Sequence, residues 1–178
     1  MTMNSHDYVA SLVAKAKAAQ EIANGFTQED VDLLTGAVAY ALTKPEVALK
    51  FGEMLVEESG MGIPEHKQAK MYGKVKGSYF QMKDKKSVGL IDVDEKMGME
   101  TYAKPMGVIG AIIPVTNGEA TPVVKSLMAL KTRNAIILAP HPKARKTNLA
   151  VTTLIRETIA KLGYPADLVQ AIEPEYVS

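Results

Sequence analysis

The chain has 178 residues and an almost balanced charge, with 21 basic and 20 acidic residues and a formal net charge of +1. This balance gives no overall field that would favour nucleic acid or an anionic membrane as a partner. The sequence contains no cysteine, which excludes disulfides, thiolate metal sites and thiol nucleophiles within these residues. No apolar stretch is long enough to cross a bilayer and the start lacks the hydrophobic region of a signal peptide, so we expect a cytoplasmic protein.

Four helices are predicted before residue 83, from helical spacing of apolar residues and from start and stop signals. Their approximate ranges are 5–24, 27–42, 45–60 and 64–82. Val9, Leu12 and Ala16 belong to one face of the first helix. Thr27 and Asp30 have a capping-box-like spacing at the start of the second. Pro45 suits a first turn, and Gly60 or Gly62 is expected to end the third helix.

Lysines alternate with aromatic residues along the predicted fourth helix, a combination that also occurs in nucleic-acid binders. The set comprises Lys74, Lys76, Lys83, Lys85, Lys86, Tyr72, Tyr79 and Phe80. The same spacing places the aromatic residues on the inner face of the helix and the lysines in solvent. The near-zero net charge favours this packing interpretation, so no nucleic-acid partner is expected. A nucleic-acid binder remains as an alternative, and it predicts salt-dependent binding to DNA.

The periodicity then changes from helix to strand. A period of two predicts a β-hairpin at 88–93 and 99–103. From Met106 the predicted order is strand, helix, strand, helix, strand. The uninterrupted apolar run at 107–113 is typical of a parallel strand covered on both faces, and 135–138 repeats the pattern. A last helix at 143–162, with Leu149, Thr153, Ile155 and Ile159 on its buried face, precedes a strand at 168–172.

These elements predict an α/β fold. It is an incomplete doubly wound, Rossmann-like parallel sheet, preceded by a helical amino-terminal region and a β-hairpin arm. Such βαβ units bind nucleotides at the carboxyl ends of their strands. Neither of the common glycine-rich phosphate loops occurs in the sequence, so this inference rests on topology and on the loops.

Few residues after the strands are candidates for chemistry. Asn117 could donate a hydrogen bond to a developing oxyanion, but Asn followed by Gly118 is also a common turn pair, and the pattern favours the turn. His141 has no second histidine at ligand spacing, so no metal site is predicted. Lys143, Arg145 and Lys146 lie in the first turn of a helix, where a bound phosphate could offset their charge, but a basic turn in solvent is the favoured interpretation.

One long segment resembles a known family. The stretch PMGVIGAIIPVTNGEATPVVKSLMALKTRNAIILAPHPKARKTN is similar to the NAD-binding core of coenzyme A-acylating aldehyde dehydrogenases, including the amino-terminal half of the bifunctional aldehyde-alcohol dehydrogenase. The motifs ESGMG at 58–62, KSVG at 86–89 and GYPADLV at 163–169 also fit. The APHP sequence after NAIIL distinguishes the acylating branch from ordinary aldehyde dehydrogenases. The resemblance covers nearly the whole chain.

The resemblance implies roles for particular residues and segments. Residues matching the nicotinamide side of the cofactor site are Ile112, Ile113, Pro114, Val115, Thr116 and Asn117. Asn117 also matches the amide that supports the thiohemiacetal oxyanion. Residues matching the adenosine wall are Ala139, Pro140 and His141. Residues 1–104 would then hold the helices and an oligomerisation-type hairpin at 88–103, which implies a homo-oligomer. Residues 105–178 would be the first βαβαβ half of an NAD-binding domain.

The family reaction converts a small aldehyde, NAD and coenzyme A as co-substrate to acyl-CoA and NADH through a cysteine thiolate. Because this chain has no cysteine and the catalytic domain is absent, we expect the chain alone to be inactive. The alternative is a non-catalytic binding or assembly module that pairs with a full-length homologue. No membrane partner is expected.

Two departures from the family pattern affect ligand preference. Gly118 and Glu119 stand where the family often has proline after the asparagine, and a carboxylate facing the site would disfavour an anionic aldehyde. In addition, no acidic residue follows the second parallel strand to bind a ribose 2′-hydroxyl, whereas Lys143 and Arg145 are near. NADP is therefore expected as a possible cofactor beside NAD.

Overall fold

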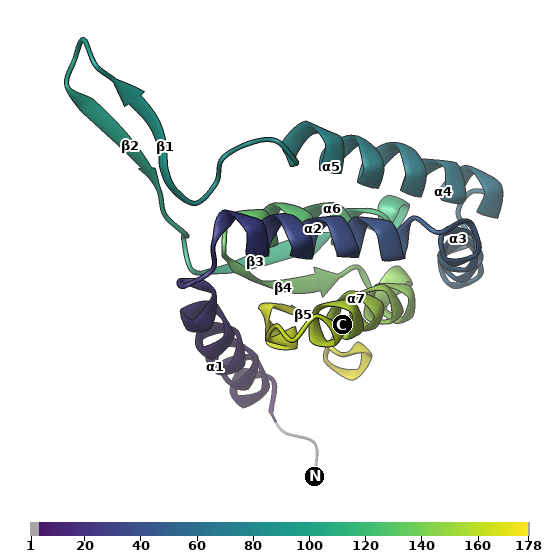
Figure 1. Ribbon diagram of the computed structural model, residues 1–178. Helices are drawn as coiled ribbons and strands as arrows, with labels where there is room; N and C mark the ends of the chain where they lie inside the picture. The colour runs from purple at the N-terminus through teal and green to yellow at the C-terminus, as the bar shows by residue number, and fades with distance from the viewer. Residues whose placement is uncertain (1–3, 178) are drawn as a thin grey trace.

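Three parallel strands form the central sheet in the order β3-β4-β5. The computed structural model describes residues 4–177. The strands are β3 (Val108–Ile113), β4 (Ala135–Pro140) and β5 (Val169–Ala171). Two crossover helices join them, α6 (Thr121–Lys131) and α7 (Arg145–Lys161). The predicted α/β fold, with its parallel sheet and preceding helical region, is confirmed (Figure 1).

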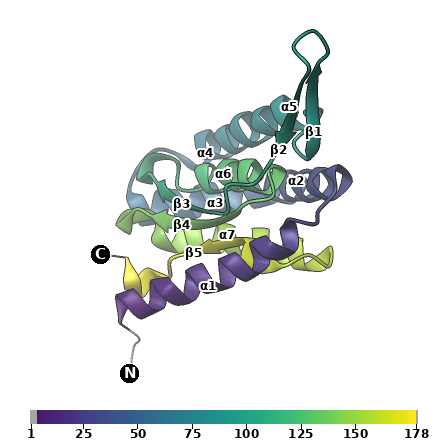
Figure 2. The ribbon, with the colours of Figure 1, turned by 90° about the vertical axis from the view of Figure 1, so that its left-hand side faces the viewer.

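The helices are distributed unequally over the two faces of the sheet. Helix α1 (Ser5–Ala23) contacts all three strands from one side, whereas α6 and α7 lie on the other side (Figure 2). Helix α2 (Gln28–Leu42) packs across α6 and α7 as a further layer, and α3 (Pro45–Ser59) packs against α7. Among residues 4–177, none of the helices is both long enough and apolar enough to span a bilayer.

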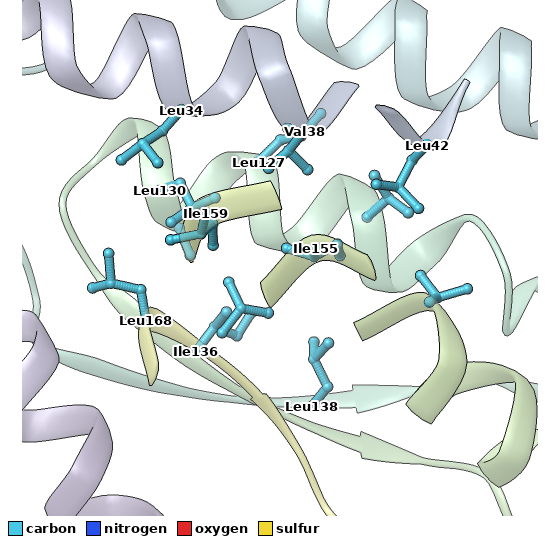
Figure 3. Packing of buried hydrophobic residues seen from close by; sticks show 14 of the residues in the cluster. Leu34, Val38, Leu42, Leu127, Leu130, Ile136, Leu138, Ile155, Ile159 and Leu168 are labelled. Carbon is cyan, nitrogen blue, oxygen red and sulfur yellow. The ribbon is translucent and has the colours of Figure 1, made fainter. Parts of the chain in front are cut away.

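The hydrophobic core fills the space between the sheet and these helices. Leucine, isoleucine and valine side chains from α2, α6, α7 and the strands meet there (Figure 3). Those shown include Leu34, Val38, Leu127, Leu130, Ile136, Leu138, Ile155 and Ile159. Each is at most 1% exposed, and full burial of such a side chain contributes about 1.5–3 kcal/mol. The core therefore holds the sheet and the helical region together.

Helix boundaries follow the local signals in the sequence. Thr27 and Asp30 form the predicted capping box, in which each side chain accepts a hydrogen bond from the other residue's backbone N–H. Gly60, one of the two glycines considered, ends α3 in the left-handed conformation with φ of 69°. A side chain at this φ would be strained, which explains why glycine suits the position.

The predicted fourth helix is continuous but contains an irregular turn. It consists of α4 (Pro64–Met71), a π-helical turn at Tyr72–Lys76 and α5 (Gly77–Met82). The expectation that its aromatic residues all face inward was wrong, because Phe80 is 62% exposed. A π turn contains more residues than an α turn and so rotates the following residues away from the predicted face.

Two burial predictions within residues 107–162 were also wrong. Strand β3 is not covered on both faces: Ala111 and Ile113 are buried, but Ile112, which points the opposite way, is 84% exposed because α1 leaves it uncovered. In α7, Thr153 is exposed and Leu149 only half-buried. The buried face instead contains Asn148, Val151, Thr152, Ile155 and Ile159, which follow the three- and four-residue spacing of one helix face. Helix α7 starts at Arg145, after a 3₁₀ turn at Pro142–Ala144.

The predicted hairpin is confirmed as β1 (Gly89–Asp94) paired antiparallel with β2 (Met99–Ala103). It projects away from the body of the molecule (Figure 1). Its pairing register shifts between Leu90 and Asp92, which is typical of a β-bulge.

Two polar side chains just before β4 stabilise the amino-terminal edge of the sheet, the side at which the parallel strands begin. Asn134 accepts hydrogen bonds from the backbone N–H groups of Met106 and Gly107 at 2.6 and 2.8 Å, and its amide nitrogen donates to the Thr132 hydroxyl at 2.7 Å. Arg133 donates to the carbonyls of Asn24 and Ala103 at 2.9 and 3.0 Å. Through these bonds, the residues just before β4 hold together the end of α1, the end of the hairpin and the start of β3.

Candidate functional site

The two segments singled out in the sequence meet where β3 and β4 end. In the parallel pairing, Ile112 lies beside Ala139 and Ile113 beside Pro140. The backbone N–H of His141 donates to the Ile113 carbonyl at 3.1 Å. Residues 112–117 and 139–141 therefore form one continuous edge, at the end of the sheet where α/β proteins bind nucleotides.

The side chains along this edge differ in their exposure to solvent. Ile113 and Pro140 are buried, so the backbone is what they offer to a ligand. Ile112 is 84% exposed and neighbours the half-buried Ala139 in the pairing register, which places both on one face of the sheet. An exposed apolar surface at the strand ends suits the flat ring of a nicotinamide or an adenine. The residues present thus fit a dinucleotide.

Asn117 lies in a 3₁₀ turn, Val115–Asn117, that follows β3. The turn position is what the Asn-Gly pair predicts, but the side chain makes no capping hydrogen bond, and α6 has Ala120 at its N-cap. Its Nδ2 has one long contact, 3.4 Å to the Thr116 hydroxyl, and its buried Oδ1 has no hydrogen-bond partner among residues 4–177. The side-chain amide therefore makes no strong hydrogen bond within the turn.

A buried lysine supports this turn from α4. Lys67 is 5% exposed, and its Nζ donates to the carbonyl of Thr116 at 2.7 Å. Desolvation lowers the pKa of Lys67, while the charge of Glu119 opposes that shift. Sequence reasoning missed this residue, because one lysine in a lysine-rich helix gives no signal that it is the buried one. The contact fixes the backbone next to Asn117.

Glu119 is fully buried beside the turn. Burial raises the pKa of its carboxyl group, and the neighbouring N–H of Glu119 itself and the charge of Lys67 only partly oppose that effect. Neither carboxyl oxygen has a partner at hydrogen-bond geometry within the described part of the chain. The condition under which Glu119 would repel an anionic aldehyde, a carboxylate facing the site, is thus not met.

Gly118 lets the turn pack closely against the rest of the fold. A Cβ at this position would lie 2.8 Å from Cβ of Ala144 and 3.1 Å from Cδ1 of Leu55. Real side chains do not approach so closely, so any substitution would displace the turn. The glycine that departs from the family pattern is therefore accommodated by close contact with α3 and the start of α7.

A carboxylate from α3 caps the amino-terminal end of α7. The carboxylate of Glu58 accepts hydrogen bonds from the backbone N–H groups of Lys146 and Thr147, each at 2.8 Å, and from the Thr147 hydroxyl at 2.8 Å. A carboxylate at a helix N-terminus is stabilised by the helix dipole. Glu58 thus occupies the backbone N–H groups that a phosphate would contact at this turn. His141 similarly caps the preceding 3₁₀ turn, with Nδ1 accepting from the Lys143 N–H at 3.1 Å.

A cavity of about 260 Å³ opens beside Asn117. It lies between the π turn and α5 on one side and α6 on the other. Lys74 and Ser78 come from the first wall, and Thr121 and Lys125 from the second. The cavity thus opens beside the Asn117 turn.

Comparison with known proteins places this geometry in a family. The aldehyde dehydrogenase family model matches residues 1–176. A sulfoacetaldehyde dehydrogenase of Acholeplasma sp is 44% identical over 165 residues, covering 93% of this chain and 34% of the relative. The bifunctional aldehyde-alcohol dehydrogenase of Escherichia coli K12 is 42% identical over 164 residues, covering 92% and 18%.

One solved structure is similar to this chain over nearly its whole length. An acetylating aldehyde dehydrogenase from Geobacillus thermoglucosidasius has a TM-score of 0.91 and 36% identity, covering 96% of this chain and 37% of that one. The chain spans about a third of the length of the sulfoacetaldehyde dehydrogenase relative. On this sequence and structural evidence, the chain belongs to the aldehyde dehydrogenase family.

Proposed function

We propose that the chain is the amino-terminal, cofactor-binding portion of a coenzyme A-acylating aldehyde dehydrogenase. The observation that carries this proposal is the single edge formed by residues 112–117 and 139–141 at the ends of β3 and β4. Relatives with acylating chemistry in their names support it. The sulfoacetaldehyde dehydrogenase relative makes a small aldehyde with an anionic group a candidate substrate.

Each part of the edge has a role in the proposal. Ile112 and Ala139 provide apolar contact for the cofactor rings, with Pro114, Val115 and Thr116 continuing the nicotinamide side and Pro140 and His141 the adenosine wall. Bound NAD supplies an acceptor for the hydride that leaves the substrate carbon. Asn117 orients the substrate carbonyl and donates to its oxygen as negative charge develops there. Lys67, through the Thr116 carbonyl, holds Asn117 in place.

The nucleophile of the family reaction is not supplied by these residues, since the sequence contains no cysteine. We therefore propose that the chain binds cofactor without forming acyl-CoA from aldehyde, NAD and coenzyme A. An assay of the purified chain with all three substrates tests this. Turnover above the uncatalysed rate would contradict it.

Cofactor binding is best tested by NMR titration of the ¹⁵N-labelled chain with NAD. We expect shifts at 112–117 and 139–141, and about tenfold weaker binding by Ile112→Asp, which places a charge on the apolar surface. Ile22→Asp is the matched control, because Ile22 is also exposed, at 59%, but lies at the far end of α1. Equal weakening by both variants, or shifts elsewhere, would contradict the proposed site.

We also propose that NADP is accepted. Arg145 is engaged with the chain's own carbonyls, donating to Val177 at 3.0 Å, whereas Lys143 is exposed and forms no ion pair within residues 4–177. Lys143 is thus the cation available to a 2′-phosphate. The same titration with NADP should give comparable affinity, and Lys143→Met should weaken NADP more than NAD. Negligible affinity for NADP would contradict this part of the proposal.

The alternative of an assembly module is favoured by one observation, the apolar surface of the hairpin. Val93 is 49% exposed, Met99 55% and Tyr102 55%, on an arm that projects from the molecule. Exposed apolar side chains of this kind often mark an interface. We propose that the arm pairs with a second copy or with a full-length homologue. Light scattering should show an oligomer that Val93→Lys dissociates, and a monomeric unmodified chain would contradict self-pairing.

A further inference from the structure

The residues that line the cavity beside Asn117 include basic side chains but no acidic ones. Two lysines line it, Lys74 on the π turn and Lys125 on α6, and no carboxylate is among its lining residues. The ion pairs within residues 4–177 use other lysines, Lys83 and Lys131. The two cavity lysines therefore carry positive charge that the described part of the chain does not pair.

The neighbouring acid does not neutralise these lysines. Glu119 is fully buried behind the turn and does not line the cavity. Burial raises the pKa of its carboxyl group, and Lys67, on the side of α4, is the lysine whose charge acts on it first. The electrostatic potential of the cavity is thus set by Lys74 and Lys125, together with the amino-terminal end of α6, where Thr121 is the first residue.

Polar and apolar residues complete the lining. Ser78, Thr121 and Asn117 carry hydrogen-bonding side chains and line the same space as the two lysines, and Ala120, Val124 and Met128 are apolar. Ammonium and hydroxyl donors are the groups that recognise the oxygens of a sulfonate or carboxylate. A volume of about 260 Å³ lies below the roughly 300–1,000 Å³ typical of sites for drug-sized ligands. The cavity therefore suits a small molecule that combines an anionic group with a short apolar part.

We propose that this cavity binds the sulfonate or carboxylate group of a short-chain aldehyde, with Lys74 and Lys125 as its cationic ligands and Asn117 near the carbonyl. The inference rests on the proposed function, because it takes Asn117 as the residue that contacts the carbonyl oxygen. It selects anionic over neutral aldehydes as the substrate class. Lys74 and Lys125 are specificity-determining residues in this account.

The test uses isethionate, a hydroxyethanesulfonate that has the anionic group but no reactive carbonyl. Titrated into the ¹⁵N-labelled chain at constant ionic strength, it should cause saturable shifts at Ser78, Thr121 and the Asn117 side-chain amide. Ethylene glycol, a neutral diol of similar size, should not. Comparable shifts with ethylene glycol, or no shifts with isethionate, would overturn the proposal without recourse to any variant.

Lysine variants sharpen the result. Lys125→Met and Lys74→Met should each weaken isethionate binding by about tenfold, as expected for loss of a hydrogen bond to a charged group. Lys125→Arg should retain most of the affinity, and Lys17→Met, an exposed lysine on α1, should change nothing. If Lys17→Met has the same effect as Lys125→Met, the binding is a general response to charge and the proposal fails.

A phosphate of coenzyme A is the other anion that these lysines could bind. Coenzyme A should not compete with isethionate for the shifts at Ser78 and Thr121, and competition would reassign the cavity to the co-substrate and overturn the proposal. The NAD titration remains an independent readout at 112–117 and 139–141. If NAD binds and isethionate does not, the anion subsite fails while the cofactor site stands; the reverse result rejects the cofactor site.

Discussion

The two ends of the central sheet each have an asparagine, but the two side chains differ in how fully they are hydrogen-bonded. Asn134, at the amino-terminal edge, uses both its amide oxygen and its amide nitrogen in hydrogen bonds of 2.6–2.8 Å. Asn117, at the carboxyl-terminal edge, has one long contact and a buried oxygen with no partner among residues 4–177. The Asn134 side chain is thus committed to the fold, whereas Nδ2 of Asn117 has only a weak acceptor within the described chain.

The contrast extends to the neighbours of each asparagine. Arg133 beside Asn134 donates to two backbone carbonyls through its terminal guanidinium nitrogens, although its buried Nε has no partner among residues 4–177. Near Asn117, the carboxyl oxygens of Glu119 lack partners in the described chain and Ile112 is largely exposed. Substitutions at the two edges should therefore separate stability from binding.

The largest effect is expected at the amino-terminal edge. Asn134→Ala removes the acceptor for two N–H groups that precede β3, leaving them without partners close to the sheet. We expect the free energy of unfolding to fall by about 2–4 kcal/mol. Urea denaturation followed by circular dichroism measures this. A loss below that of Asn117→Ala would contradict the distinction between the edges.

A smaller loss is expected at the cap of α7. Glu58→Gln removes the negative charge and one of the two oxygens that accept hydrogen bonds from Lys146 and Thr147. The free energy of unfolding should fall by about 1–2 kcal/mol. Glu57→Gln, an exposed neighbour on α3, is the matched control. Equal effects of the two variants would show that the cap contributes nothing.

The buried acid near Asn117 should be visible in the pH dependence of stability. Because burial raises the pKa of Glu119, the folded chain keeps this proton where the unfolded chain loses it, above the ordinary value of 4.5. Its contribution to stability is present at lower pH and is lost as pH rises through the raised pKa. Lys67 has the opposite effect at high pH. Because its pKa is lowered, the folded chain loses this proton before the unfolded chain does, so its contribution to stability increases as pH rises toward the ordinary value of 10.5.

Glu119→Gln removes this titration. We therefore expect the free energy of unfolding of the variant, relative to the unmodified chain, to increase between pH 4 and pH 8. Urea denaturation across this range measures the difference. Exposed Glu157 provides the control variant Glu157→Gln, whose difference should stay flat. A relative stability of Glu119→Gln that falls as pH rises would contradict the burial of an uncompensated carboxyl group.

The smallest effect on stability is expected at the carboxyl-terminal edge. Asn117→Ala deletes an amide whose single contact is 3.4 Å long, so the free energy of unfolding should change by no more than about 0.5 kcal/mol. Binding of isethionate should nevertheless weaken, because the amide lies at the edge of its cavity. Measured beside Asn134→Ala, this variant tests the comparison directly. A large stability loss would give Asn117 the structural role of a turn residue.

The sequence predicted the fold well because its signals are local. The capping box at Thr27, the glycine stop at Gly60 and the apolar run of β3 each need only neighbouring residues to be interpreted, and all three elements form where expected. The π turn was not predictable in this way, and it reversed the expected burial of Phe80. An extra residue within one helix leaves no periodic trace.

The strand residues of the site were predictable, but the residues that contact them from distant helices were not. Residues 112–117 and 139–141 adjoin strands recognised from apolar runs, so parallel pairing brings them together. Lys67 and Glu58 reach the same region from helices 49 and 88 residues away in sequence from their partners. Contacts at such separations depend on tertiary packing, which spacing alone does not encode.

We propose that the carboxyl-terminal edge of the sheet binds ligand, whereas the amino-terminal edge is structural. The most direct test is the ¹⁵N NMR titration of the chain with NAD, comparing amide shifts at 112–117 and 139–141 with those at 132–134. Saturable shifts confined to the first two segments are the predicted result. Shifts centred on 132–134, or none at millimolar NAD, would contradict the account.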